Sequence, residues 1–274
     1  MPYVAFDAVT LRSRLYSESS RIVTFLTREE GLITGIAKGV RGTRSRFGAA
    51  LEPLQHVRIT VSMRRGRDLQ TVTGADLLHP WSRIREDLFT AAYAQAAAEL
   101  LTRTLWQAHP GEDLYELLLT ILQTYDEGLA DPQLLFLCFG MHLVADLGYA
   151  LDLEACAGCG GELTEQVTVS FSEGAVRCAG CYQPGGQVLR TQRDTIRLLV
   201  ALGRPDGPAA AASVKASTQT RREAERLLRN HLEYHTDTRL DLNALRLAES
   251  LGPRRRFRRT GNRDDSHSGT APPE

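Results

Sequence analysis

The 274-residue sequence contains no apolar run long enough to cross a membrane. Its longest runs, such as residues 134–140, fall far short of the roughly 20 residues that a spanning helix needs. The first residues lack the basic start and apolar stretch of a secretory signal. Cysteine is scarce: four of the five cysteines are clustered, whereas a secreted disulfide scaffold spreads its cysteines over a small domain. These absences predict a cytoplasmic protein that has no membrane partner.

Several sequence motifs of catalysis are also missing. The sequence has no Gly-x-x-x-x-Gly-Lys-Ser/Thr loop of a P-loop ATPase, no Gly-x-Gly-x-x-Gly dinucleotide fingerprint and no Gly-x-Ser-x-Gly elbow. His231 and His235, one helical turn apart, lack the intervening glutamate of a metalloprotease helix. The acidic residues of 81–155 fit helix surfaces better than a two-metal nuclease. We therefore find no catalytic set, and we expect that the protein is not an enzyme.

Charge is balanced over the whole chain but not along it. The 33 basic and 33 acidic residues give a formal net charge of zero. Residues 1–80 contain 12 Lys or Arg and 7 Asp or Glu, whereas residues 81–155 contain 3 and 12. A basic end joined to an acidic middle indicates one surface that faces a polyanion and a separate body that repels polyanions.

Residues 1–77 have the pattern of short β-strands. In the first strand, Val9, Leu11, Ser13 and Leu15 alternate with Thr10, Arg12, Arg14 and Tyr16. Further strands are predicted at residues 21–27, 32–38, 55–63 and 69–77. Five short strands in about 75 residues favour a small closed barrel, such as the OB-fold, over an open sheet with unprotected edges.

After Pro80 the sequence becomes rich in alanine, leucine and glutamate at helical spacing. Asp131 is the expected N-cap of one helix and Gly148 its stop. Helices are predicted at residues 82–108, 113–125, 132–147, 192–202, 218–235 and 243–251, and a loop of Ala, Gly and Pro at 203–212. The predicted fold class is α+β: a five-stranded OB-fold domain at residues 1–79, an α-helical domain at 80–252 and a disordered basic tail at 253–274.

The most specific motif is a pair of Cys-x-x-Cys sequences separated by 18 residues. Each pair offers two thiolates from one tight turn, and zinc takes four such ligands at tetrahedral corners. The separation matches the roughly 15–20 residues of a zinc ribbon, and residues 167–171 and 174–177 read as a hairpin that joins the two pairs. We predict one Zn²⁺ ion in a zinc finger at residues 153–190, held by Cys156, Cys159, Cys178 and Cys181.

Two other roles compete for these cysteines. Redox-active disulfides need a thioredoxin-like βαβ context, which the sequence does not show. A catalytic zinc keeps an open position beside three protein ligands, and the His-x-Glu of zinc deaminases is absent. Four cysteines close the site, so we expect a structural zinc. The fifth cysteine, Cys138, lies in an apolar run and is expected in the core.

Basic residues gather at three places in the N-terminal region. A glycine-rich loop at residues 38–47 holds four cations and no acid, a turn at 64–67 adds three, and two more lie on the first strand. Lys and Arg neutralise phosphates, and an aromatic ring stacks on unpaired bases. Either loop by itself is equally well read as a solvated surface loop. Together they predict a DNA-binding surface, and its expected residues are Arg12, Arg14, Lys38, Arg41, Arg44, Arg46, Phe47, Arg64, Arg65 and Arg67.

Two further basic groups are expected to be peripheral. Arg222, Arg226 and Arg229 share one helix face, where Glu223 and Glu225 partly compensate them, so this face is read as solvated. The arginines at residues 254–259 lie in the tail and are read as a weak accessory for phosphate binding.

A set of short motifs resembles the bacterial DNA repair proteins of the RecO family. The resemblance covers residues 1–251 and continues through the helical middle and the cysteine ribbon. Its motifs are Tyr16-Ser-Glu18-Ser-Ser20, residues 27–31, Ala37-Lys38-Gly39 with Arg41 and Ser45-Arg46, Leu51-Glu52-Pro53-Leu54, Leu69 and Tyr234-His235. Members of the family tend to have Leu-Gln-Pro-Phe at 51–54, so Glu52 and Leu54 depart from the pattern. Not all members retain the four cysteines, which argues for a structural metal.

The resemblance implies an N-terminal OB-fold and a helical body with a zinc finger. It also implies a recombination mediator that binds single- and double-stranded DNA at the nucleoid and anneals complementary strands without ATP. Such proteins work with RecR and help to load RecA onto DNA coated by single-stranded DNA-binding protein (SSB), whose acidic C-terminal tail they contact. A basic surface screens the repulsion between two phosphate backbones, and base pairing then drives annealing.

Two alternatives stay open on the residues alone. One is an RNA-binding or transcription-associated barrel with a zinc ribbon, which competition between RNA and DNA strands would distinguish. The other is a nuclease that uses the acidic helices, which incubation with labelled DNA and Mg²⁺ would reveal.

Overall fold

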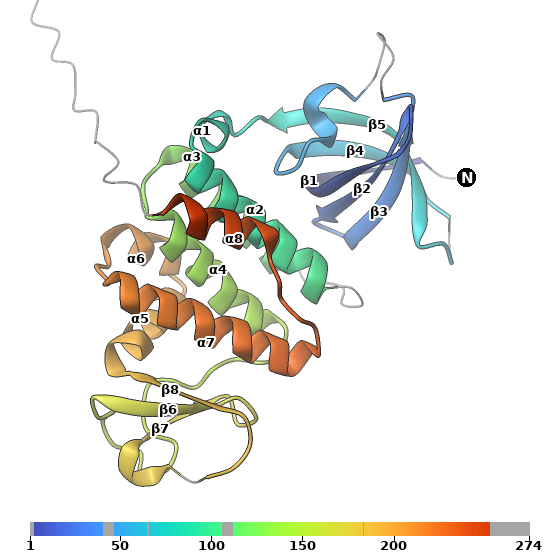
Figure 1. Ribbon diagram of the computed structural model, residues 1–274. Helices are drawn as coiled ribbons and strands as arrows, with labels where there is room; N and C mark the ends of the chain where they lie inside the picture. Colours follow the sequence, from blue (N-terminus) through green and yellow to red (C-terminus); the bar gives the residue numbers. More distant parts are fainter. Residues whose placement is uncertain (1–2, 41–46, 65, 106–111, 183, 253–274) are drawn as a thin grey trace, which may run out of the picture.

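The computed structural model describes residues 3–252 except for 41–46, 65, 106–111 and 183. The predicted DNA-binding residues Arg41, Arg44, Arg46 and Arg65, and the tail at 253–274, lie outside the described residues. Figure 1 shows a β-barrel beside a bundle of helices, and a small three-stranded sheet at the far end of that bundle. Within the described part of the chain, no helix is both long and apolar enough to cross a membrane.

The N-terminal strands form a closed five-stranded barrel. They are β1 (Tyr3–Ser17), β2 (Ser20–Thr27), β3 (Gly31–Lys38), β4 (His56–Ser62) and β5 (Leu69–His79). Their order around the barrel is β1-β2-β3-β5-β4, with β3 and β5 parallel and the other pairs antiparallel. This is the closed OB-type barrel that the strand pattern predicts.

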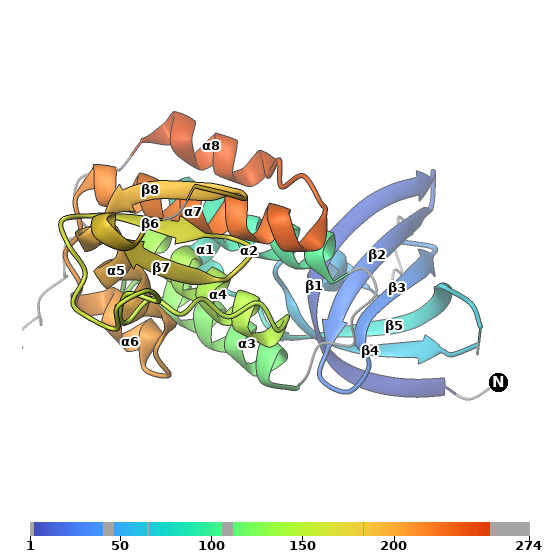
Figure 2. The same cartoon turned by 90° about the horizontal axis from the view of Figure 1, so that it is seen from below.

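The first strand closes the barrel because it is long and bent. It pairs with β4 over Tyr3–Val9 and with β2 over Ala8–Ser17, and Figure 2 shows it curving around the barrel. Inside lie aromatic and β-branched side chains such as Phe25 and Ile59. At the β3–β5 contact, a Cβ on Gly35 would stand 2.5 Å from Cγ2 of Val72, so the closure requires glycine there.

Eight helices of the described chain form the body. They are α1 (Ser82–Glu86), α2 (Leu88–Thr104), α3 (Glu112–Glu127), α4 (Pro132–Asp146), α5 (Arg193–Gly203), α6 (Gly207–Ser213), α7 (Thr218–Thr236) and α8 (Asn243–Leu251). Helix α4 is apolar on nearly all sides and therefore lies at the centre, in contact with α2, α3, α5, α6 and α7. Cys138 is buried within it, as predicted.

Two sequence-based helix predictions need correction. The single helix expected at 82–108 is two helices, because the chain breaks at Asp87, whose carboxylate accepts the N–H of Thr90 at 3.1 Å and caps α2. The loop expected at 203–212 contains α6. Its proline stands in the first turn, where a missing N–H costs nothing, and a Cβ on Gly207 would lie 2.8 Å from Sγ of Cys138.

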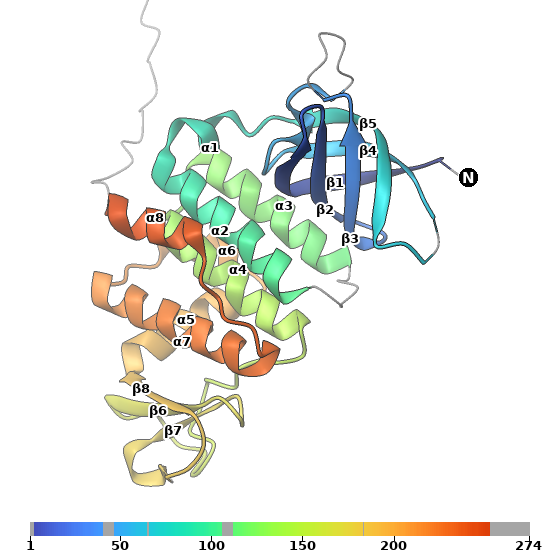
Figure 3. The same cartoon turned by 45° about the vertical axis from the view of Figure 1, so that its right-hand side comes forward.

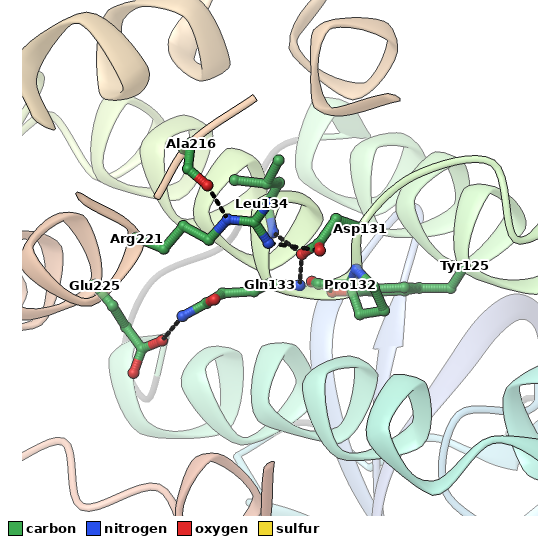
Figure 4. Close-up of polar contacts among 8 residues, drawn as sticks. All are labelled: Tyr125, Asp131, Pro132, Gln133, Leu134, Ala216, Arg221 and Glu225. Carbon is green, nitrogen blue, oxygen red and sulfur yellow. Dashed lines mark hydrogen bonds and ion pairs between the residues drawn. The ribbon is translucent and has the colours of Figure 1, made fainter. Parts of the chain in front are cut away.

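The start of α4 is fixed by polar contacts with α7 (Figure 4). Asp131 caps α4 as predicted, accepting the N–H groups of Gln133 and Leu134 at 3.0 and 3.3 Å, and it pairs with Arg221 at 2.5 Å. Gln133 donates to Glu225 at 3.1 Å, and burial raises the pKa of that carboxyl group. Glu225 thus joins α7 to α4, and it also compensates Arg222 and Arg229 in part, since both arginines act to lower its pKa.

The barrel and the helices share apolar contacts. Val9, Leu11 and Leu26 of the barrel belong to the same core cluster as the helices, together with Trp81 at the junction. At the rim of this contact, Arg28 pairs with Glu112 and Glu116 of α3. The barrel is therefore held against the helices by apolar surface that points away from its own interior.

The cysteine region forms a three-stranded sheet at the opposite end of the bundle (Figure 3). Its strands are β6 (Gln166–Ser170), β7 (Ala175–Cys178) and β8 (Val188–Gln192), in the order β7-β6-β8. The hairpin β6–β7 was predicted, whereas β8 was not. The sheet is tied to α7 where Nε2 of His235 donates to the carbonyl of Phe171 at 2.8 Å.

Candidate nucleic-acid interface and metal site

The four cysteines of the two Cys-x-x-Cys sequences meet in space. Their sulfur atoms all lie within 4.8 Å of one another. Cys156 and Cys159 stand on the turn before β6, while Cys178 ends β7 and Cys181 is the last residue of the short 3₁₀ helix (Ala179–Cys181) that follows. Four sulfurs about 2.3 Å from a central ion stand roughly 3.8 Å apart in a tetrahedron, so this cluster fits such an ion.

Backbone N–H groups donate hydrogen bonds to this cluster and favour the thiolate form, which binds cations. The N–H groups of Cys178 and Gly158 donate to Sγ of Cys156 at 3.3 and 3.4 Å. The hydrogen bond from Cys178 is the main reason why the pKa of the Cys156 thiol falls to about 6. Hydrogen bonding with Cys178 raises the pKa of Cys181 to about 12. Zinc binds cysteines as thiolates, so a metal ion at this cluster would displace the protons that the thiols carry.

Glycine is required inside the first turn. A Cβ on Gly158 would stand 2.7 Å from Cβ of Cys181, so any side chain there would push the two cysteine pairs apart. No histidine or carboxylate joins this set among the described residues. A four-sulfur set leaves no open coordination position, so the site can hold a metal for structure.

The second candidate site is a cationic face on the barrel, which we define as Arg12, Arg14 and Lys38. Register places Arg12 beside Thr24 and Thr34, Arg14 beside Ile22 and Ile36, and Lys38 beside Ser20. In strands, residues that are register partners share one side of the sheet. The three cations therefore stand on the outer side of β1, β2 and β3, and all three are exposed.

These three cations differ from other barrel arginines. Arg21 pairs with Glu52 at 2.9 Å, Arg28 with Glu112 at 3.2 Å, and Arg58 with Asp7 at 2.8 Å. The hydrogen bond from Arg58 holds the pKa of Asp7 below its usual value. Arg12, Arg14 and Lys38 form no ion pair with any residue that the structure describes. Their charge is thus available to an outside anion.

The predicted basic turn at residues 64–67 joins β4 to β5, a connection that OB-folds use for ligand binding. Arg64 and Arg67 are exposed. The buried side chain of Gln70 shapes the turn, since it accepts the N–H of Arg64 at 2.7 Å and donates to the carbonyls of Arg64 and Arg67 at 3.1 and 2.6 Å. Gln70 is not among the residues predicted from the sequence; a polar residue on the inward face of a strand was its only signal.

Phe47 requires a correction. Its place after the basic loop led to the prediction that its ring stacks on a base. In the structure Phe47 is 4% exposed and belongs to the barrel core with Ala50 and Leu51. No face of the ring is open to an incoming base, because apolar burial stabilises it inside the barrel.

The protein combines three parts in one chain: an OB-type barrel with a cationic face, a helical body and a four-cysteine ribbon. This combination of domains defines its class. Two family models match it: Recombination protein O N terminal over residues 1–81 and Recombination protein O C terminal over residues 85–243. The chain belongs to the RecO family.

Curated relatives agree over nearly the full length. The chain is 35% identical over 254 residues, 92% of its length and 98% of the relative's, to the DNA repair protein RecO of Anaeromyxobacter sp. strain K. It is 34% identical to the DNA repair protein RecO of Symbiobacterium thermophilum, covering 85% and 92% of the two chains. The protein of that name from Thermobifida fusca is 35% identical, over 89% and 97%.

Proposed function

We propose that this protein is a recombination mediator in DNA repair. In this proposal it binds single- and double-stranded DNA and anneals complementary strands without ATP. With RecR it helps to load RecA onto SSB-coated DNA, contacting the SSB C-terminal tail. Membership of the RecO family and the name of the relatives, DNA repair protein, support this proposal. It acts in the cytoplasm, associated with the nucleoid.

The observation that carries the proposal is the unpaired charge of Arg12, Arg14 and Lys38 on the outer side of an OB-type barrel. Paired arginines such as Arg58 have an internal counter-ion to give up before they can bind phosphate, whereas these three do not. We assign DNA binding to residues 1–79, with Arg41, Arg44, Arg46, Arg64, Arg65 and Arg67 as further contacts.

Annealing by this surface is electrostatic. Each strand repels its complement through its phosphates, and cations that neutralise the phosphates lower this repulsion while base pairing drives the product. The step transfers no chemical group, so the protein needs no nucleophile and is proposed not to be an enzyme. The four cysteines are proposed to hold one Zn²⁺ ion in a structural role, within the helical unit of residues 80–252.

The test compares a double variant, Arg12→Gln with Arg14→Gln, with the control Arg58→Gln. We expect the double variant to weaken binding to a single-stranded oligonucleotide and to slow annealing. The slope of log affinity against log salt should become less steep by about 1 to 1.5, roughly 0.7 for each phosphate that the protein no longer neutralises. Arg58→Gln should leave the salt slope unchanged, because the partner of Arg58 is Asp7 and not a phosphate.

The same annealing assay with SSB-coated strands, without nucleotide, tests partner tolerance and independence from ATP. Native rates in the double variant, on bare and on coated strands, would overturn the assignment of the DNA surface. Cleavage of labelled DNA in the presence of Mg²⁺ would overturn the proposal that the protein is not an enzyme.

A further inference from the structure

Tyr16 is an exposed aromatic residue that the proposed DNA surface does not use. The other aromatic residues with described side chains in the barrel fall into two groups: Phe6, Phe25 and Phe47 are buried, and Tyr3 is exposed at the opposite end of β1. Tyr16 is 64% exposed, and it makes no ring contact or hydrogen bond with the described chain. It therefore contributes little to the barrel itself.

A β-bulge separates Tyr16 from the strand ladder. Leu15 is the register partner of Arg21 and Ser17 that of Ser20, so Tyr16 is the additional residue, with no partner on β2. Bulges re-aim a side chain and are common beside binding sites. Here the bulge lies one ladder pair, Ser17 with Ser20, before the β1–β2 turn, a loop that OB-folds use to bind oligonucleotides.

The surroundings of Tyr16 are cationic. Arg14 stands two residues earlier, about 6.6 Å along the strand. On the other side, Ser17 is the partner of Ser20, which in turn is the partner of Lys38 on β3. The N–H of Val40 donates to the carbonyl of Ser19 at 2.9 Å and ties the turn to the end of β3. The turn thus lies between two unpaired cations.

We propose that Tyr16 is a base-stacking platform for one unpaired nucleotide of a DNA single strand, while Arg14 and Lys38 bind the phosphates on either side of it. This inference rests on the proposed function. A tyrosine ring stacks on any base, because every base has a π face, and alanine substitution at such platforms weakens binding about tenfold per base. Tyr16 takes the role that the sequence pattern had indicated for Phe47, and it adds a contact that salt does not screen.

The test measures binding of two oligomers of equal length, oligothymidylate and an abasic strand that has phosphates but no bases. The variants are Tyr16→Leu, which keeps apolar bulk without a π face, and Tyr16→Phe and Tyr16→Trp, which keep the ring. Leu15→Ala, an exposed apolar residue on the same strand, is the matched control. Circular dichroism confirms that each variant is folded.

We expect Tyr16→Leu to weaken oligothymidylate binding about tenfold at every salt concentration, with an unchanged salt slope and unchanged binding of the abasic strand. Tyr16→Phe, Tyr16→Trp and Leu15→Ala should bind both oligomers within twofold of the native protein. These results would separate a stacked base from a phosphate contact, since loss of an arginine changes the slope.

Native binding of oligothymidylate by Tyr16→Leu would overturn the inference and leave the proposed function standing. An equal loss on both oligomers would also overturn it, because the ring would then act on the backbone or on the turn. Native binding of both oligomers with failure on SSB-coated strands would make Tyr16 a protein contact, against the inference. If the native protein binds neither oligomer, the proposed function fails as well.

Discussion

The barrel and the cysteine ribbon are two small β-structures on one helical body, and they are stabilised in different ways. The barrel closes its hydrogen-bond ladder from β1 to β4 and fills its interior with side chains such as Phe25 and Ile59. The ribbon has three short strands that do not close into a barrel, and four sulfurs in one cluster. A closed ladder around an apolar core stabilises itself, whereas a sheet this small needs a cross-link or a neighbour.

The two structures also differ in how their cations are used. In the ribbon, Arg177 pairs with Glu173, and Arg193, the first residue of α5, pairs with Glu165. On the barrel, Arg12 and Arg14 have no acidic partner among the described residues. Arg177 and Arg193 therefore hold loops of the ribbon, whereas Arg12 and Arg14 keep their charge for an outside anion.

Removal of the metal should have the largest effect and should act on the ribbon alone. Cys156→Ser, or a chelator, is expected to abolish amide protection in β6 and β7, because the fold of a structural zinc site depends on the metal. Barrel amides and binding of single-stranded DNA should stay close to native. Hydrogen exchange measured by mass spectrometry would check both. Unchanged protection in β6 and β7 after chelation would contradict the proposed metal site.

A cavity in the barrel core should have the next largest effect. Phe25 is completely buried, so Phe25→Ala is expected to lower the free energy of unfolding by about 3–5 kcal/mol. Urea denaturation followed by circular dichroism measures this change. Leu15→Ala on the exposed end of β1 is the control and should change stability by less than about 0.5 kcal/mol. Equal losses in the two variants would show that the barrel is not held by its interior.

Acidic pH should lower stability by weakening the packing around His231 of α7. His231 is fully buried and donates to the carbonyl of Tyr149 at 2.7 Å, and burial lowers its pKa. Below about pH 6.5 the unfolded chain takes up a proton that folded His231 resists, so stability falls as the pH drops. Between pH 7.5 and 5.5 the melting temperature should fall more in the native protein than in His231→Gln. Equal falls would exclude His231 as the cause.

The smallest effect is expected at the rim of the barrel. Arg21 pairs with Glu52, one of the two residues that depart from the RecO pattern, and both side chains are partly exposed. Glu52→Gln should lower stability by less than about 1 kcal/mol, because exposed ion pairs contribute little and the amide oxygen still accepts a hydrogen bond. Urea titration would check this. A loss comparable to that of Phe25→Ala would mean that this pair, and not the core, closes the barrel end.

Sequence patterns predicted the barrel well because its strands alternate and end at turns. The pattern failed where local order is broken: Leu15, which the alternation places on the same strand face as Val9 and Leu11, is 56% exposed near the end of β1, beside the bulge. The first half of β1 was missed, because its partner β4 lies far along the chain. Helix α6 was read as a loop, because its stability comes from packing on α4 and α5 and its composition is that of a turn.

The candidate sites were predictable to different degrees. Cysteine spacing carries the geometry of four ligands, so the cluster could be predicted from sequence, and the structure brings all four sulfurs together. A basic loop says little about which way its neighbours point, and for that reason Phe47 was assigned to the surface while its ring lies in the core. Arg58 forms an ion pair, whereas Arg12 forms none with the described part of the chain. Such pairing joins residues that are distant in the sequence, so it depends on the fold and has no signal in the local sequence.

The apolar contact between barrel and helices has a consequence for dissecting this chain. Val9, Leu11 and Leu26 turn their side chains toward the helices, so a fragment that ends at residue 79 would leave them in water. Such a fragment would tend to self-associate through this patch. The isolated barrel is therefore poorly suited for fusion to another protein unless these three positions are first made polar.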